Sequence, residues 1–212
     1  REIKLTYRNY YDVMTILLFF ILGILIFVFA VGSNKEILNN ISIAIIWTLL
    51  LLSTNLSISK FYEEDFNDGN LFLFHLSGLS FELIVLIKLI AFWFVYQLPF
   101  LLIIPIACLL LNMPYKEIIL LLSVFLLSSP ILTFLASISG SMNLLSNKNY
   151  AIGSVIVMLL SIPTIIFSVS ITNAPQELIK PQLSIIVGIL LLFLALTPWI
   201  SAACIKIALK NK

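Results

Sequence analysis

Six long apolar stretches, separated by short polar connections, take up most of this 212-residue chain. A helix needs about 20 consecutive, mostly apolar residues to cross the hydrocarbon core of a bilayer. Inside the bilayer a helix satisfies its backbone hydrogen bonds within one segment. The pattern therefore predicts an all-α polytopic membrane protein with about six transmembrane helices. We place the spans at residues 13–32, 41–59, 83–111, 116–142, 150–171 and 183–205.

The composition leaves little room for a soluble part. Apolar residues make up 61% of the chain and charged residues 10%, and the mean hydropathy is +1.15. A soluble domain carries charge on about a quarter of its residues. We therefore expect residues 1–212 to form a single transmembrane domain whose outer surface faces lipid. The net charge of +2, without a basic run, gives no indication of nucleic acid binding.

The polar ends and loops predict an orientation. Residues 1–12 combine basic residues at helical spacing with tyrosines on another side, which is typical of an interfacial helix in the headgroup layer. One set of loops and ends holds Arg1, Lys4, Arg8, Lys60, Lys148, Lys206, Lys210 and Lys212, against Lys35, Lys116 and Lys180 in the other set. Because basic loops stay in the cytoplasm, we expect both termini and the loop at 60–82 to be cytoplasmic.

Motifs for catalysis are missing from the sequence. The chain has one histidine, and no HExxH, GxSxG or GxxxxGK(S/T) motif occurs. It therefore offers no multi-histidine metal site, no recognisable nucleophile and no phosphate-binding loop of its own. We expect a protein that is not an enzyme, with no catalytic residue and no metal ligand. The one histidine, His75, is interpreted as a structural or solvated residue.

The loop at 60–82 is the one substantial polar insertion. Glu63, Glu64, Asp65 and Asp68 form an acidic cluster in it, and its apolar residues after Gly69 include Leu71, Phe72 and Phe74. Acidic residues just before a short helix cap it and interact favourably with its dipole. Exposed apolar residues need a partner or a membrane to cover them. Two interpretations stay open: the loop lies on the membrane surface, or it docks a cytoplasmic partner.

Prolines are concentrated in the last four spans. The third span holds Pro99 and Pro105, and the others hold Pro130, Pro163 and Pro198. Each proline removes a helical hydrogen bond, and broken helices at mid-membrane are a feature of transporters. Their placement favours a transport or gating role.

Two further features of the spans have a structural interpretation. Lys88 lies six residues past Glu82, about 9 Å along the helix, so its stem is expected to snorkel to the headgroups. Ser129, Thr133, Ser137 and Ser141 recur at four-residue spacing in the fourth span. Such a small, weakly polar face allows close helix packing, which we favour over a substrate path.

Several of these marks recur together along one known family. They include Ile45-Ile46-Trp47, the D-x-x-D-G of Asp65, Asp68 and Gly69, then Lys88, Trp93, Leu98-Pro99, Pro105, Pro130, Ile162-Pro163, Pro198, Ala202-Ala203 and Lys206. In these residues the chain resembles the cytochrome c maturation haem exporter protein B family (CcmB), the membrane subunits of an ABC-type complex. The chain departs from the family at Lys60, Phe72, Gly78 and Ser80, where an arginine, an acidic residue and prolines are usual.

The resemblance implies a fold like that of ABC-2 type exporters and a separate ATPase subunit (CcmA) that binds ATP. It implies that the loop at 60–82 contains a cytoplasmic coupling helix. The docking residues would be Glu63, Glu64, Asp65, Asp68, Gly69, Leu71, Phe72 and Phe74. The candidates for helix breaks or a translocation path are Trp93, Pro99, Pro105, Pro130, Pro163 and Pro198.

The further partners implied are CcmC, CcmD and the haem chaperone CcmE. Haem is the implied substrate, moved directly or released with its chaperone, and no cofactor is expected to be bound by this chain itself. The implied location is the bacterial cytoplasmic membrane or the mitochondrial inner membrane. A permease of the same architecture for a lipid or glycan, and a non-transporting assembly scaffold, remain alternatives.

Overall fold

The computed structural model describes residues 10–32, 34–58, 61–145 and 150–211, and within these ranges it contains helices and no strand. Six helical segments are long and apolar enough to cross a membrane. They are α2 (Tyr10–Val31), α3 (Lys35–Ser57), α6 with η2 and α7 (Phe81–Phe92, Trp93–Gln97 and Phe100–Leu110), α8 (Tyr115–Asn143), α9 (Tyr150–Asn173) and α10 (Gln176–Lys210). The predicted all-α membrane fold with about six spans is confirmed.

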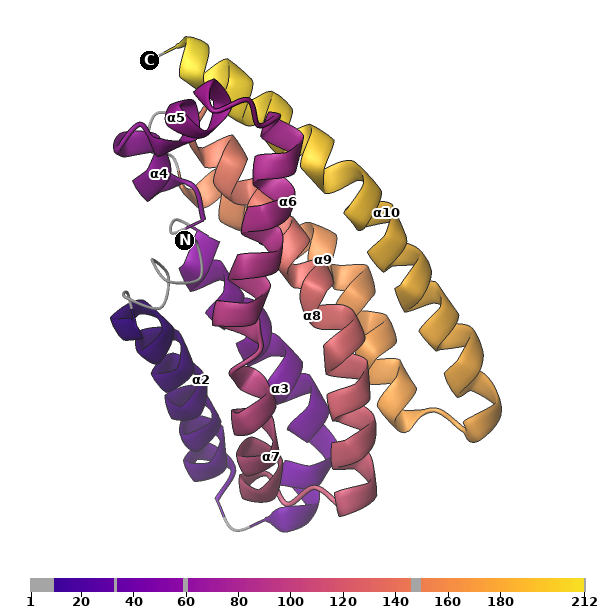
Figure 1. Ribbon diagram of the computed structural model, residues 1–212. Helices are drawn as coiled ribbons and strands as arrows, with labels where there is room; N and C mark the ends of the chain where they lie inside the picture. The colour runs from indigo at the N-terminus through magenta and orange to yellow at the C-terminus, as the bar shows by residue number, and fades with distance from the viewer. Residues whose placement is uncertain (1–9, 33, 59–60, 146–149, 212) are drawn as a thin grey trace.

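Two short helices, α4 (Glu63–Asn67) and α5 (Asn70–Leu76), connect α3 to α6. Figure 1 shows them at one end of the bundle, the end at which the C-terminus also lies. Helices α3, α8 and α10 end near them, and α6 and α9 begin there. This end of the bundle therefore carries the structured connection, whereas the turns at the other end are short.

The helices run further than the predicted spans at several ends. Asn34 caps α3, since its side-chain oxygen accepts a hydrogen bond from the Ile37 amide at 3.2 Å. Pro175 precedes α10, which continues through Pro181, so most of the loop expected at 172–182 is helical. The predicted interfacial helix at 1–12 lies largely outside the described residues, and Tyr10 already belongs to α2.

Helix α8 is the centre of the bundle. It packs against α3, α6, η2, α7, α9 and α10, and every residue from 131 to 141 is buried. Ser129, Thr133, Ser137 and Ser141 are fully buried there. The small side chains allow neighbouring backbones to approach closely, so the predicted packing role of this face is confirmed.

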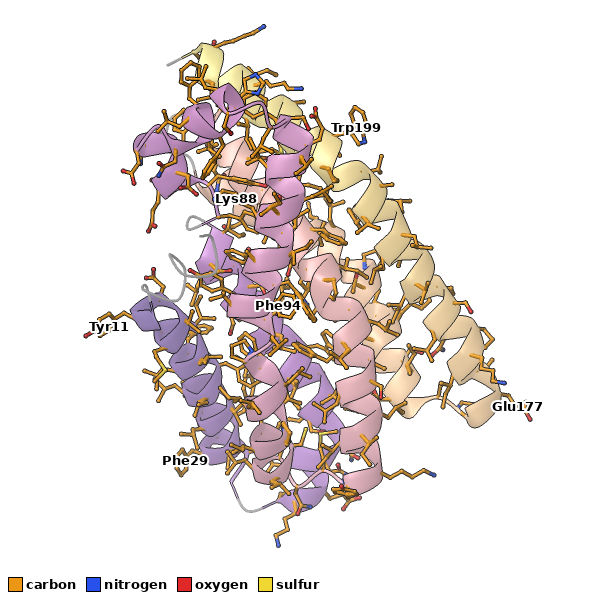
Figure 2. All side chains as sticks on the ribbon, viewed as in Figure 1. Tyr11, Phe29, Lys88, Phe94, Glu177 and Trp199 are labelled. Carbon is orange, nitrogen blue, oxygen red and sulfur yellow. The ribbon has the colours of Figure 1, made fainter. Side chains whose placement is uncertain are left out.

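The outer surface of the bundle is apolar. Figure 2 shows Tyr11 and Phe29 on α2 and Trp199 on α10 pointing away from the bundle, and these side chains are 70%, 79% and 70% exposed. Helix α2 packs chiefly on α3 and α7. Large exposed apolar surface of this kind fits a lipid environment.

The third span is interrupted at one place only. Around Pro99 the α-helix gives way to the π-helix η2 and a turn, and the Leu98 amide bonds to the Trp93 carbonyl, five residues back, at 3.0 Å. Pro99 itself has no amide hydrogen to continue the ladder, and π-turns are frequent at functional sites.

The other prolines, which were candidates for helix breaks or a translocation path, do not interrupt their helices. Pro105 lies inside α7, Pro130 inside α8, Pro163 inside α9 and Pro198 inside α10, and each of these helices is continuous. The proline ring holds φ near the helical value, and in membrane helices neighbouring groups compensate the lost hydrogen bond. A role of these prolines in translocation stays a prediction.

Candidate functional site

The segment from residue 61 to residue 80, which contains α4 and α5, is called the helical loop below. Gly69 separates its two helices with φ of 74°, a left-handed conformation that other L-residues adopt at a cost of about 1–2 kcal/mol. Across this turn, the Asn70 side-chain amide donates to Asp65 Oδ1 at 3.2 Å. Ser80 ends the loop by capping α6, where its hydroxyl accepts from the Leu83 amide at 3.3 Å. Local sequence therefore determines both turns.

The inner face of the helical loop is built into the bundle. Phe61, Tyr62 and Leu71 are 3%, 1% and 0% exposed. The Phe61 ring stacks on the Phe92 ring of α6, with centroids 4.2 Å apart. Gly140 of α8 makes room for this contact, because a Cβ there would lie 3.1 Å from Phe61 Cβ. The loop is thus a packed part of the fold.

Lys88 is the main polar link between the span and the helical loop. Lys88 belongs to α6 and is buried. Its ammonium forms an ion pair with the Asp65 carboxylate and donates to the Phe61 carbonyl at 3.5 Å. The ammonium also lies 5.7 Å from the centroid of the Tyr62 ring, within cation–π range. Figure 2 shows Lys88 between α6 and the helical loop.

The expectation that Lys88 snorkels to the headgroups is wrong. The residue is 7% exposed and lies inside the protein. The position of a lysine on a span gives its depth in the membrane, but it does not reveal which residue pairs with its charge. Here the helical loop brings Asp65 back against the span, and the ion pair replaces the headgroup contact.

Tyr62 connects the helical loop to two other spans. Its hydroxyl is 2.7 Å from Ser137 Oγ on α8, and Ser137 Oγ is 3.1 Å from Ser201 Oγ on α10. Burial raises the pKa of the Tyr62 phenol, so the group keeps its proton and can donate. The three hydroxyls join the loop, α8 and α10 in one buried set.

The outer face of the helical loop has a different character. Phe72, Leu73 and Leu76 of α5 are 51%, 59% and 65% exposed, and Glu64 and Asp68 are exposed beside them. A shallow groove at this face is lined by Asp68, Gly69, Phe72, Leu73 and Leu209, the last from the end of α10. Apolar side chains framed by carboxylates are therefore presented at one end of the bundle.

The structure divides the predicted docking residues between the two faces. Leu71 is fully buried, and Asp65 is directed to Lys88. Glu63 and Phe74 are half-buried, Gly69 forms the turn, and Glu64, Asp68 and Phe72 are exposed. Sequence reasoning missed Leu73 and Leu209, which also line the groove. The repeat of apolar residues along 71–76 indicates a short helix, but it does not say which side is covered.

The interruption in the third span is held by two side-chain hydrogen bonds. Trp93 Nε1 donates to Ser129 Oγ at 2.9 Å, and Gln97 Nε2 donates to Thr54 Oγ1 at 3.0 Å. Ser129 precedes Pro130 in α8, so the candidates Trp93 and Pro130 lie next to each other. The break is therefore tied to α3 on one side and to α8 on the other.

His75 has a local structural role. Its Nδ1 is 3.1 Å from the Leu79 carbonyl, and its ring stacks on Phe81 with centroids 4.2 Å apart. These contacts hold the end of α5 to the start of α6, in agreement with the structural interpretation of this histidine.

The fold and the site define an α-helical polytopic membrane protein with a structured loop clamped to three of its spans. A family model described as "CcmB protein" matches residues 1–208, and the chain belongs to that family.

Curated relatives agree along the whole chain. The chain is 30% identical over 213 residues to a protein named "Heme exporter protein B" from Haemophilus influenzae, which covers 100% of this chain and 96% of the relative. Proteins of the same name from Rhodobacter capsulatus and Paracoccus denitrificans are each 30% identical, over 92% and 99% of this chain and 90% and 97% of their own lengths.

Proposed function

We propose that this chain is the membrane subunit of an ABC-type complex that exports or delivers haem for c-type cytochrome maturation in the bacterial cytoplasmic membrane. The name of its relatives, "Heme exporter protein B", supports the substrate. The resemblance to CcmB supports the partners: an ATPase subunit (CcmA) that binds ATP, and CcmC, CcmD and the chaperone CcmE. The chain itself contributes the spans and carries no ATPase site.

The observation that carries the proposal is the two-faced helical loop. One face is built into the bundle through Phe61, Tyr62 and Leu71, and the other presents Phe72 and Leu73 between carboxylates. A cytoplasmic partner that covers this face would push on α6, α8 and α10 together. The acidic rim calls for basic groups on the partner, since complementary charges steer association and fix its register.

The helical loop would then lie on the cytoplasmic side, as the distribution of Lys and Arg predicts. Both termini would lie on that side. Movement of the spans would either carry haem outward or release the haem-loaded chaperone, through changes around Trp93, Pro99 and the remaining prolines of the translocation set.

Two substitutions on the outer face test the docking. Phe72→Ala removes an exposed aromatic anchor, and loss of such an anchor costs about 2 kcal/mol or ~30-fold in Kd. Asp68→Lys reverses charge at the groove. Both variants should accumulate in the membrane like the parent chain but co-purify with much less ATPase. Glu177→Lys, at the opposite end of the bundle (Figure 2), is the matched charge-reversal control and should co-purify normally.

If both loop variants co-purify with as much ATPase as the parent chain does, the proposed docking is contradicted. The substrate is tested separately, by deleting the gene for the chain and staining membranes for covalent haem. Loss of c-type cytochromes is expected. Intact c-type cytochromes would favour a permease for a lipid or glycan.

A further inference from the structure

The ammonium of Lys88 joins a span to the helical loop through three groups of that loop. These groups are the Asp65 carboxylate, the Phe61 carbonyl at 3.5 Å and the Tyr62 ring at 5.7 Å. Lys88 is 7% exposed, and the Asp65 side chain is 16% exposed. The cation comes from α6 and every one of these partners comes from the loop. A displacement of the loop therefore changes the environment of a charge that is fixed to the span.

Stability alone is a weak reason for such a pair. Taking two charges out of water offsets much of their attraction, and well-packed apolar residues of similar volume are often as stabilising. What the pair does provide is a directional contact, since either group left alone would be a poorly solvated charge. Moving the loop away from the span would break this ion pair, so the loop and the span are expected to move together.

Beyond Lys88, span 3 has a place where it can bend. Helix α6 ends at Phe92, and the π-helix and turn that end at Pro99 separate it from α7. Interruptions of this kind are where helices kink. A force on Lys88 can therefore tilt α6 about residues 93–99 while α7 stays packed against α2 and α8.

We propose that Lys88 and Asp65 are positioning residues of the coupling step, which transmit a displacement of the helical loop to α6. This inference rests on the proposed function, because the ATPase supplies the displacement. The residues contact neither ATP nor haem. Their action is to keep α6 and the loop in register while the loop is pushed.

A second ion pair provides a matched control. Lys206 on α10 is 2.8 Å from Glu82 on α6, so this pair joins two spans at the same end of the bundle, next to the end of the helical loop. It is also more exposed, and exposed pairs contribute little to stability.

The test uses the full complex expressed from its own genes and three sets of variants. Asp65→Leu with Lys88→Met replaces the buried pair by apolar residues, Lys88→Arg keeps the pair, and Glu82→Gln with Lys206→Met removes the control pair. Four quantities are measured: the membrane level of the chain, the amount of co-purified ATPase, the rate of ATP hydrolysis and the yield of c-type cytochromes.

Because Asp65 is directed to Lys88 and not to the outer face that would dock the ATPase, the apolar double variant should keep its membrane level, bound ATPase and ATP hydrolysis within about twofold of the parent, whereas the cytochrome yield falls at least tenfold. Lys88→Arg should keep more than half of the yield, and the control pair should keep all of it. A parent-level yield in the apolar variant would overturn the inference. So would a fall matched by an equal fall in membrane level or bound ATPase, which would assign the pair to folding or docking. If the parent chain binds no ATPase, the proposed function fails instead.

Discussion

The buried hydroxyls of Tyr62, Ser137 and Ser201 make a prediction that the structure can quantify. All three residues are at most 1% exposed; the Tyr62 hydroxyl bonds to Ser137, and Ser137 bonds to Ser201. Ser201→Ala leaves the bond between Tyr62 and Ser137 in place. This single change should therefore cost only about 0.5–1.5 kcal/mol, the usual net value of one hydrogen bond.

The double variant Ser137→Ala with Ser201→Ala should behave differently. It removes Ser137, the serine to which the Tyr62 hydroxyl bonds, and a buried donor without a partner costs about 1–3 kcal/mol. The double variant should therefore lose ~1–3 kcal/mol more than Ser201→Ala alone. Adding Tyr62→Phe removes the stranded hydroxyl but keeps the ring. The triple variant should recover to within about 1 kcal/mol of the parent chain, because removing both sides of a hydrogen bond is nearly neutral.

Thermal unfolding of the purified chain in detergent measures this series. For a chain of this size each kcal/mol corresponds to roughly 2–4 °C in Tm, so the double and triple variants should be clearly separated. Interhelical hydrogen bonds in membrane proteins are often weaker, about 0.6 kcal/mol, which lowers the scale but keeps the order. A triple variant as unstable as the double would show that the stranded hydroxyl is not the cause, and the reasoning would be refuted.

Four further substitutions follow from the backbone and are checked in the same unfolding assay or by cytochrome yield. Gly140→Ala should cost about 1–3 kcal/mol by overpacking, since its Cβ would lie 3.1 Å from the Ile58 carbonyl oxygen. Gly188→Ala is the control and should be neutral or stabilising, because a Cβ there would meet open space. Gly69→Ala should cost about 1–2 kcal/mol, because φ there is 74°; an unchanged Tm would contradict the left-handed turn. Pro99→Ala restores an amide hydrogen at the break in span 3 and should lower the cytochrome yield while the chain still inserts; a parent-level yield would favour a scaffold that does not need the break.

The spans were predictable because hydrophobic length is a local property. Their ends were less so, as α10 shows. Residues 172–182 fall between two predicted spans, but Pro175 stands before the first turn of α10, whose first amides have no partner in the helix anyway, and Pro181 lies inside the helix and removes only one hydrogen bond. A proline marks a break only when the rest of the helix cannot compensate, and the sequence around Pro99 and Pro130 does not reveal that difference.

The helical loop was predictable in its location and less so in its contacts. The acidic and apolar residues of the helical loop were visible in the sequence, but the orientation of Asp65 toward Lys88 was not, because the two residues are 23 positions apart. Tyr62 was not singled out, since its partner Ser137 lies 75 positions further on. Contacts between distant segments depend on how the helices pack, and a single sequence carries no direct record of that packing.

The burial of residues 131–141 of α8 on all sides sets an order in which the bundle can open. A helix that six other helical segments surround can expose its backbone only after they separate from it, whereas α2 can leave by breaking its contacts chiefly with α3 and α7. In hydrogen–deuterium exchange the amides of residues 131–141 should therefore be the last to exchange, and those of α2 among the first. Different spans would then open at different rates, and the helix at the centre of the bundle would keep its backbone hydrogen bonds longest.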